Sequence, residues 1–304
     1  MKHIKHFFSN SWHIIKAAAA NFRNGEPIVY SAAIAFFTIF SLPAILIVLT
    51  QIGSAFFARQ QVRGQIISEV GNLISARAGA QVSTLLENLM QVPSGFWGVL
   101  ISVIVVIQSA SISFFIMQKA LNAVWHIKVK PGIGFKKLLR RRLSALAMVG
   151  GLGLLLILSL LLNTAIAMYR EQLLNLFEEF FTPAIRTINT LFYLLVVLIF
   201  FTSVHKVLPD AKVHWKDALA GGIITSILFL IGKQLINYLL SSVKIVGIYA
   251  TAGSFVVVLL WVFYSSVILL LGAEVTRAYA NHYGRFVKPT AIAYKYEEVS
   301  SKEA

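Results

Sequence analysis

The sequence is 304 residues long, with 58% hydrophobic residues, 13% charged residues and a mean hydropathy of +0.77. Ordinary soluble domains carry about 25% charged residues, so this composition excludes a water-soluble globule and an intrinsically disordered chain. The chain has no cysteine, which excludes a disulfide scaffold and thiol redox chemistry. The formal net charge of +15 suits either nucleic acid or an anionic lipid surface as a partner.

Six stretches are apolar and long enough to cross a bilayer as helices. About 20 residues, each rising about 1.5 Å, span the roughly 30 Å of hydrocarbon. The stretches cover residues 28–52, 96–118, 143–168, 187–204, 218–240 and 255–276. Pro43 falls inside the first stretch and predicts a kink there. The sequence therefore predicts an all-α integral membrane protein with a six-helix transmembrane domain over residues 28–276.

The positive charges lie mainly on one side of these spans. If the N-terminus is inside, 20 of the 27 Lys and Arg residues fall in segments 1–27, 119–142, 206–217 and 277–304. Short cytoplasmic segments carry the excess of Lys and Arg in membrane proteins. We therefore expect both termini, including the tail 277–304, to lie in the cytoplasm.

Helical spacing of apolar residues predicts further helices on both faces of the membrane. In residues 1–27, Ile4, Phe8, Trp12 and Ile15 form an apolar stripe, and lysines occupy much of the remaining surface. This pattern predicts an amphipathic helix that lies at the inner interface or packs beneath the bundle. On the outer side, residues 59–92 predict two short helices. Residues 169–182 predict a third.

The run from Leu208 to Ala218 (LPDAKVHWKDA), continuing through Gly221-Gly222, resembles the YihY/BrkB family of bacterial inner-membrane proteins, long mislabelled ribonuclease BN. Three further stretches agree: 30–43 (YSAAIAFFTIFSLP), 120–125 (ALNAVW) and 249–253 (YATAG), which leads to 271–274 (LGAE). The motif residues to which we assign structural roles are Pro43, Lys119, Asn122, Trp125, Pro209, Asp210, Trp215, Asp217, Gly222 and Gly253. The resemblance implies a six-helix protein of the bacterial cytoplasmic membrane, a role in lipid export or envelope biogenesis, and no agreed catalytic residues.

Polar residues inside the predicted spans are the candidates for function, because a central Lys or Asp costs about 2.5 to 3.5 kcal/mol on insertion scales. The candidates for substrate or lipid contact are Lys233, Gln234, Asn237, Gln108, Ser111 and Glu274. Lys233 and Asn237 are four residues apart and share one face of the fifth span. For Lys233, a snorkelling side chain without a task and a buried ion pair are the alternatives. Gln108 and Ser111 also suit hydrogen bonds between helices.

Glu274 has two candidate partners at the end of the sixth span. Lys119 lies at a similar depth and would form an ion pair between helices. Arg277 is three residues further along the same helix and would clamp the helix end. The spacing favours the second arrangement.

No residue pattern indicates catalysis or metal binding. The seven His residues are scattered, and Asp210 with His214 supplies two ligands at most, which do not make a metal site. We therefore expect no enzymatic activity, ribonuclease included, and no cofactor or metal.

The densest basic patch consists of Lys136, Lys137, Arg140, Arg141 and Arg142. It lies beside a span and lacks interleaved aromatic residues, which favours anionic lipid over nucleic acid as its partner.

Two functions stay open. The first is a transporter or lipid-handling protein that moves an anionic amphipathic substrate along the second, fifth and sixth spans, without an ATP motif. The second is a non-catalytic assembly or scaffold protein of the envelope, whose loops bind envelope proteins.

Overall fold

The computed structural model describes residues 2–54, 56–73, 76–90, 108, 112–132, 151, 154, 181–242 and 253–296. The described part is mostly helical, as predicted. Its helices are α1 (Lys2–Asn24), α2 (Pro27–Ser54), α3 (Arg59–Leu73), α4 (Ala76–Met90), α7 (Phe181–Val207), α8 (Trp215–Ser242) and α10 (Gly253–His282). A further helix, Ile112–Val124, precedes the first of two short strands, β1 (Ile127–Val129) and β2 (Ala293–Lys295).

Two of the described helices contain stretches that are long and apolar enough to cross a membrane: Trp215–Leu235 in α8 and Val258–His282 in α10. Shorter apolar helical stretches are Pro27–Phe40, Ile112–Val124 and Tyr193–Val207. Each of the five overlaps a predicted span. The predicted span 143–168, apart from two residues, and most of 96–118 lie outside the described residues, as does nearly all of the predicted helix 169–182.

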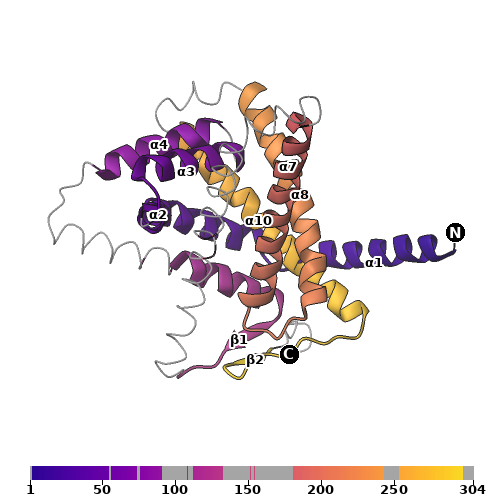
Figure 1. Ribbon diagram of the computed structural model, residues 1–304. Coiled ribbons are helices and arrows are strands. Elements are labelled where there is room, and N and C mark those ends of the chain that lie inside the picture. The colour runs from indigo at the N-terminus through magenta and orange to yellow at the C-terminus, as the bar shows by residue number, and fades with distance from the viewer. Residues whose placement is uncertain are drawn as a thin grey trace.

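The helices α7, α8 and α10 form the centre of the described structure. Helix α8 packs along both α7 and α10, and α10 also packs against α1 and α2. In Figure 1, α7 and α8 run side by side, α10 passes diagonally, and α1 and α2 run across the view. A row of aromatic rings joins the central helices, with ring centroids 5.5 Å apart for Phe201 and Phe229 and 5.0 Å apart for Phe229 and Trp261. These edge-on contacts are the favoured geometry for aromatic pairs.

Glycines allow α8 and α10 to approach closely. A Cβ atom at Gly221 of α8 would overlap the hydroxyl of Thr276, and one at Gly272 of α10 would overlap the hydroxyl of Thr225. A Cβ atom at Gly222 would overlap the hydroxyl of Thr202 in α7. Gly222 therefore lies where α8 approaches α7 closely.

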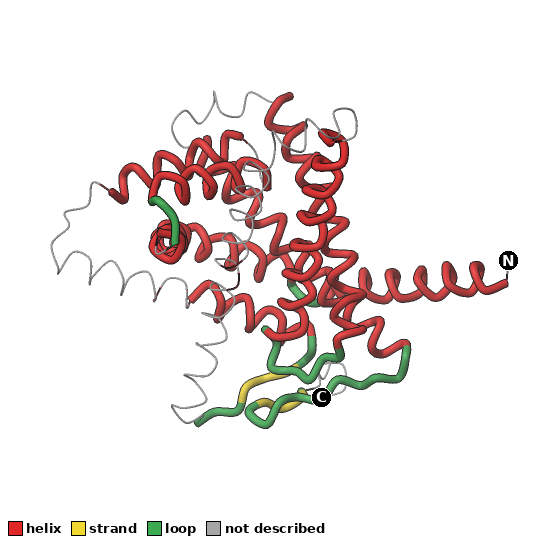
Figure 2. The backbone as a smooth tube through the Cα atoms, in the orientation of Figure 1, coloured by secondary structure: helices red, strands yellow, loops and turns green. Residues whose placement is uncertain are grey.

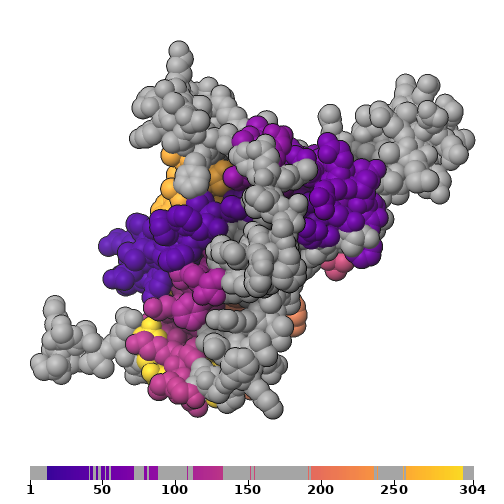
Figure 3. Space-filling model, turned by 90° about the vertical axis from the view of Figure 1, so that its left-hand side faces the viewer, coloured from indigo at the N-terminus to yellow at the C-terminus, as the bar shows by residue number. Residues whose placement is uncertain are grey.

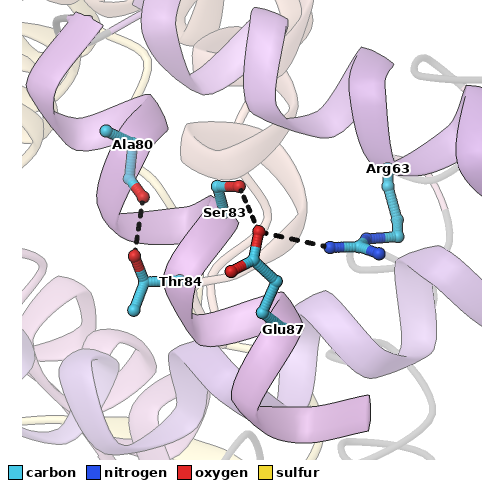
Figure 4. Close-up of polar contacts among 5 residues, drawn as sticks. All are labelled: Arg63, Ala80, Ser83, Thr84 and Glu87. Atoms are coloured by element: carbon cyan, nitrogen blue, oxygen red, sulfur yellow. Dashed lines mark hydrogen bonds and ion pairs between the residues drawn. The ribbon is translucent and has the colours of Figure 1, made fainter.

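The two short helices predicted from residues 59–92 are α3 and α4, which pack against each other. Val62 and Ile66 of α3 and Val82 and Leu86 of α4 are buried around Leu46 of α2. On the surface of this pair, Arg63 of α3 lies 3.9 Å from the carboxylate of Glu87 in α4, and Ser83 donates a hydrogen bond to the same carboxylate (Figure 4). The apolar residues whose helical spacing predicted these two helices thus pack against each other and against α2.

Helix α1 packs on α10 through its C-terminal half. Ile14 and Ala18 are buried against Val275 and Ala278 of α10. Trp12 is 67% exposed, and the N-terminal end of the helix extends away from the other helices (Figure 1). The structure therefore gives this half of α1 the packed arrangement, one of the two that the sequence allowed.

Candidate functional site

The two strands and the loops next to them gather at one end of the helices, which we call the strand end (Figure 2). It consists of residues 125–132, residues 206–217 from the end of α7 through the α7–α8 loop to the first turn of α8, and residues 283–296 after α10. Strands β1 and β2 are antiparallel, with Ile127 opposite Lys295 and Val129 opposite Ala293. In Figure 3, residues 112–132 (magenta) lie next to C-terminal residues (yellow) at the lower end of the face shown.

The α7–α8 loop is held at the strand end through Asp210. Asn122 donates a hydrogen bond of 2.7 Å to the Asp210 carboxylate, and the backbone N–H of Asp210 donates one of 2.7 Å to the side-chain oxygen of Asn122. Gln118 donates to the backbone oxygen of Leu208 at 2.9 Å. Thr290 donates its backbone N–H to the backbone oxygen of Asp210 at 2.9 Å. Asn122 and Asp210 thus contact each other directly. His214 lies near Asp217 instead of Asp210.

Asp217 lies in the first turn of α8, where a carboxylate is stabilised by the helix dipole. Its side chain is 0% exposed. The guanidinium of Arg285 lies 2.6 Å from one carboxylate oxygen, and His214 Nδ1 lies 3.7 Å from the other. Arg285 also lies over the rings of Tyr279 and Tyr283. An ion pair thus joins the start of α8 to the segment after α10, and the sequence did not predict this contact.

The two tryptophans of the motif have different surroundings. Trp125 is buried with Val213, Ala218 and Ala280, and so belongs to the apolar core of the strand end. Trp215 is 60% exposed and begins α8, with the ammonium group of Lys206 located 5.6 Å from its ring centre. Lys206 also donates a hydrogen bond to the backbone oxygen of Val213.

Three other motif residues occupy structural positions. Pro209 is buried in the α7–α8 loop, Pro43 lies inside α2, and Gly253 begins α10.

The structure pairs Glu274 with Arg277 rather than with Lys119. The Glu274 carboxylate is buried and lies 3.7 Å from the Arg277 guanidinium, which also donates a hydrogen bond of 2.9 Å to the backbone oxygen of Val124. Lys119 is exposed. The hypothesis of a direct Lys119–Glu274 pair is therefore not supported, because Arg277 on the next turn of α10 is the closer cation. Arg277 still links α10 to the helix Ile112–Val124.

Lys233 is half-buried on α8, and its ammonium group lies 5.0 Å from the ring centre of Tyr193 in α7. Glu69 of α3 is the acidic residue that acts on it electrostatically. Gln234 beside it is exposed. The distance to the Tyr193 ring is within reach of a cation–π interaction. Sequence reasoning found Lys233 but not this aromatic partner, which lies on another helix.

The remaining candidate residues are either exposed or lie outside the described part of the chain. Gln108 is exposed, and the side chain of Asn237 in α8 lies outside the described part. Residues outside the described part are Ser111, Lys136, Lys137, Arg140, Arg141 and Arg142. The predicted basic patch and the predicted face shared by Lys233 and Asn237 therefore stay predictions.

An exposed aliphatic stripe runs along α8 on the side opposite to its glycines. It consists of Leu219, Ile223, Ile227, Ile231 and Leu235, spaced four residues apart. A similar row of exposed residues, also four residues apart, lies on α7 and consists of Leu191, Leu195 and Ile199. Such side chains are stable on a surface that contacts lipid rather than water.

His205 of α7 is a buried polar residue at the crossing of the central helices. Its Nε2 lies 3.2 Å from the backbone oxygen of Leu269 in α10. A Cβ atom at Gly221 would come within 3.1 Å of its Nδ1. Sequence reasoning treated His205 as one of several scattered histidines, because nothing in the local pattern shows which helices surround it. Among the described residues, no group of three His, Asp or Glu side chains is arranged to hold a metal.

Comparison with known proteins places this arrangement in a family. Residues 18–292 match the family model described as virulence factor BrkB. The chain is similar to a UPF0761 membrane protein of Psychrobacter sp. (strain PRwf-1), with 24% identity over 89% of this chain and 49% of the relative. A similar protein of Paraburkholderia xenovorans (strain LB400) is 24% identical over 86% of the chain and 58% of the relative. One from Janthinobacterium sp. (strain Marseille) is 27% identical over 58% of the chain and 38% of the relative.

The chain thus spans about half the length of the curated relatives it matches. No solved structure shows a significant match.

Proposed function

This chain belongs to the family described as virulence factor BrkB, a family of membrane proteins, and we propose that it is a six-span bacterial inner-membrane protein that handles an anionic amphipathic lipid. The proposed spans are residues 28–52, 96–118, 143–168, 187–204, 218–240 and 255–276, with both termini in the cytoplasm. Lipid handling here means that a lipid headgroup moves along the surface of α8.

The aliphatic stripe on α8 supports the membrane-spanning arrangement. From Leu219 to Leu235 the exposed side chains follow one face of the helix for about 24 Å, most of the thickness of the hydrocarbon layer. The opposite face carries the glycines and hydroxyls that contact α7 and α10. A helix with one face packed and the other uniformly aliphatic has the surfaces of an outer helix in a membrane bundle.

The position of Lys233 is the observation that carries the proposal of lipid handling. Lys233 is half-buried where α8 packs against α7, one helical turn after the buried Phe229, so it lies on the packed side of α8 and not on the aliphatic stripe. Tyr193 lies on one side of it and the exposed Gln234 follows it in sequence. A half-buried cation inside a proposed span needs an aromatic or anionic partner, and the phosphate group of a lipid is an anion that suits it.

The test is lipid transfer by the purified protein in vesicles. We expect the wild type to speed the movement of a fluorescent anionic phospholipid between leaflets, and Lys233→Ala to lower this rate at least fivefold. Lys233→Arg keeps the cation and should retain most of the rate. Arg59→Ala, which removes an exposed cation from α3, is the matched control. Equal transfer rates for Lys233→Ala and the wild type would contradict the proposal. If only substitutions in the loops lower the transfer rate, the alternative function as an envelope scaffold protein would be favoured.

The proposed topology has an independent test, because the chain contains no cysteine. Gln60→Cys in α3 and Ala291→Cys at the strand end each introduce one thiol at an exposed position. With a membrane-impermeant maleimide, we expect labelling of the first variant in spheroplasts and of the second only after permeabilisation. Labelling of both from the same side would overturn the arrangement.

We also propose that the protein is not an enzyme and needs no cofactor. The acidic residues at the strand end and in the nearby part of α10 already have partners: Asp210 with Asn122, Asp217 with Arg285 and Glu274 with Arg277. Incubation of the purified protein with RNA tests this. Cleavage that Asp210→Asn abolishes would contradict it.

A further inference from the structure

The charges at the strand end have an unequal distribution between interior and surface. Residues 125–132, 206–217 and 283–296 contain eight Lys and Arg residues but only two acidic residues, Asp210 and Asp217. Both carboxylates are buried and paired within the protein. The outer surface of these segments is therefore cationic.

The exposed cations of this surface lie close together because the backbone brings their segments together. The backbone N–H of Lys212 donates to the backbone oxygen of Lys288 at 2.8 Å, and Ala211 pairs with Pro289 in a bridge. Lys212, Lys216 and Lys288 are all exposed. On the neighbouring strand pair, Lys128 lies opposite Tyr294.

Large aromatic side chains are exposed among these cations. Trp215 is 60% and Phe286 is 73% exposed, and Tyr283 and Tyr294 are also exposed. Trp215 lies one helical turn before Leu219, where the aliphatic stripe of α8 begins. Trp and Tyr concentrate at the interface between hydrocarbon and headgroups, where one part of the side chain is apolar and another is wet.

We propose that the strand end is a docking surface for the anionic headgroups of the membrane leaflet that it faces. Its lysines contact the phosphates, and Trp215 and Phe286 enter the headgroup layer. A lipid surface fits better than nucleic acid because the cationic patch directly adjoins the lipid-facing stripe of α8. The inference rests on the membrane-spanning arrangement proposed above, and it does not depend on lipid transfer or on Lys233.

The first test is a titration of the purified full chain, in a neutral detergent, with mixed micelles that contain phosphatidylglycerol or phosphatidylcholine. We expect half-saturation at much lower phosphatidylglycerol content, and weaker binding as salt rises. Each lysine near an anionic surface contributes about fivefold in affinity, so Lys212→Gln/Lys288→Gln should bind about 25-fold more weakly. These two residues make backbone contacts, which glutamine retains.

Arg59→Gln removes a cation from α3 and serves as the control, with binding expected within twofold of the wild type. Equal binding by the double variant and the wild type would overturn the inference. So would a single-stranded RNA that displaces phosphatidylglycerol at the same ionic strength. Intact binding without lipid transfer would leave this inference standing and remove only the proposed function.

Fluorescence quenching gives a second readout that does not depend on affinity. The chain has five tryptophans, so the difference between the wild type and Trp215→Phe isolates the signal of Trp215. We expect brominated phosphatidylglycerol to quench this signal more strongly than brominated phosphatidylcholine. A Trp215 signal that neither lipid quenches would contradict insertion at this surface.

Discussion

Asn122 and Asp210 exchange two hydrogen bonds of 2.7 Å across 88 positions of sequence. Both side chains are buried, so water does not supply an alternative partner for either of them. The pair joins the helix Ile112–Val124 to the α7–α8 loop, and so brings together two of the sequence stretches that carry the family resemblance. Their shared role is to hold the strand end in one arrangement.

We predict that Asn122→Ala lowers the free energy of unfolding by about 1–3 kcal/mol, because the Asp210 carboxylate and backbone N–H lose their partner while buried. Denaturant unfolding in detergent measures the change. Asn122→Asp should be worse, since it places two carboxylates in contact. The exchange Asn122→Asp/Asp210→Asn should recover part of the loss. A double variant no more stable than Asn122→Asp would show that the two residues are not coupled.

Arg285→Gln should lower stability by about 3–5 kcal/mol, because it leaves the Asp217 carboxylate buried without its cation. Adding Asp217→Asn removes the stranded charge, so the double variant should be more stable than Arg285→Gln alone. Lys288→Gln, a surface change in the same segment, should stay within about 0.5 kcal/mol of the wild type. Thermal unfolding of the four proteins in one detergent is the measurement. A double variant less stable than the single would refute the ion pair.

Two glycine substitutions should change stability in opposite directions. Gly272→Ala places a methyl group against Thr225 at the α8–α10 crossing and should cost about 1–3 kcal/mol. Gly64→Ala on the exposed face of α3 meets no atom within 4 Å and should stabilise by about 0.5–1 kcal/mol. Unfolding midpoints of both variants test the prediction. Equal shifts would mean that the helices can separate at Gly272 without cost.

His126 has a positive φ of 51° between the helix Ile112–Val124 and β1. Asparagine tolerates this left-handed conformation, whereas a β-branched residue does not. We therefore expect His126→Asn to change stability little and His126→Val to lower it by about 1–2 kcal/mol, as measured by thermal unfolding. A His126→Val variant more stable than His126→Asn would contradict the left-handed backbone conformation of this residue.

The central helices could be predicted from the sequence because long apolar runs have few alternatives. The predicted span 218–240 corresponds to α8 over Trp215–Ser242, which continues beyond the apolar run at both ends. The extra residues at the start include Asp217, in the first turn of the helix. The interface of α3 and α4 was predictable for a similar reason, since its apolar residues recur at helical spacing.

The contacts of the candidate residues could not be predicted in the same way. Depth in the membrane offered Lys119 as an alternative partner of Glu274, but depth does not fix the direction in which a helix faces, and the local spacing that favoured Arg277 agrees with the pair in the structure. Arg285 and Tyr193 lie far along the chain from Asp217 and Lys233, and no local pattern links them. Such partners depend on how helices rotate against one another, and only the packed structure determines that rotation.

The pairing of β1 with β2 has a consequence for the order of biogenesis. A ribosome completes Ile127–Val129 long before Ala293–Lys295, and α7, α8 and α10 are all made in between. The first strand therefore has no partner strand until the residues after α10 have been made. This small sheet can therefore form only late in synthesis, and it joins residues made about 165 positions apart.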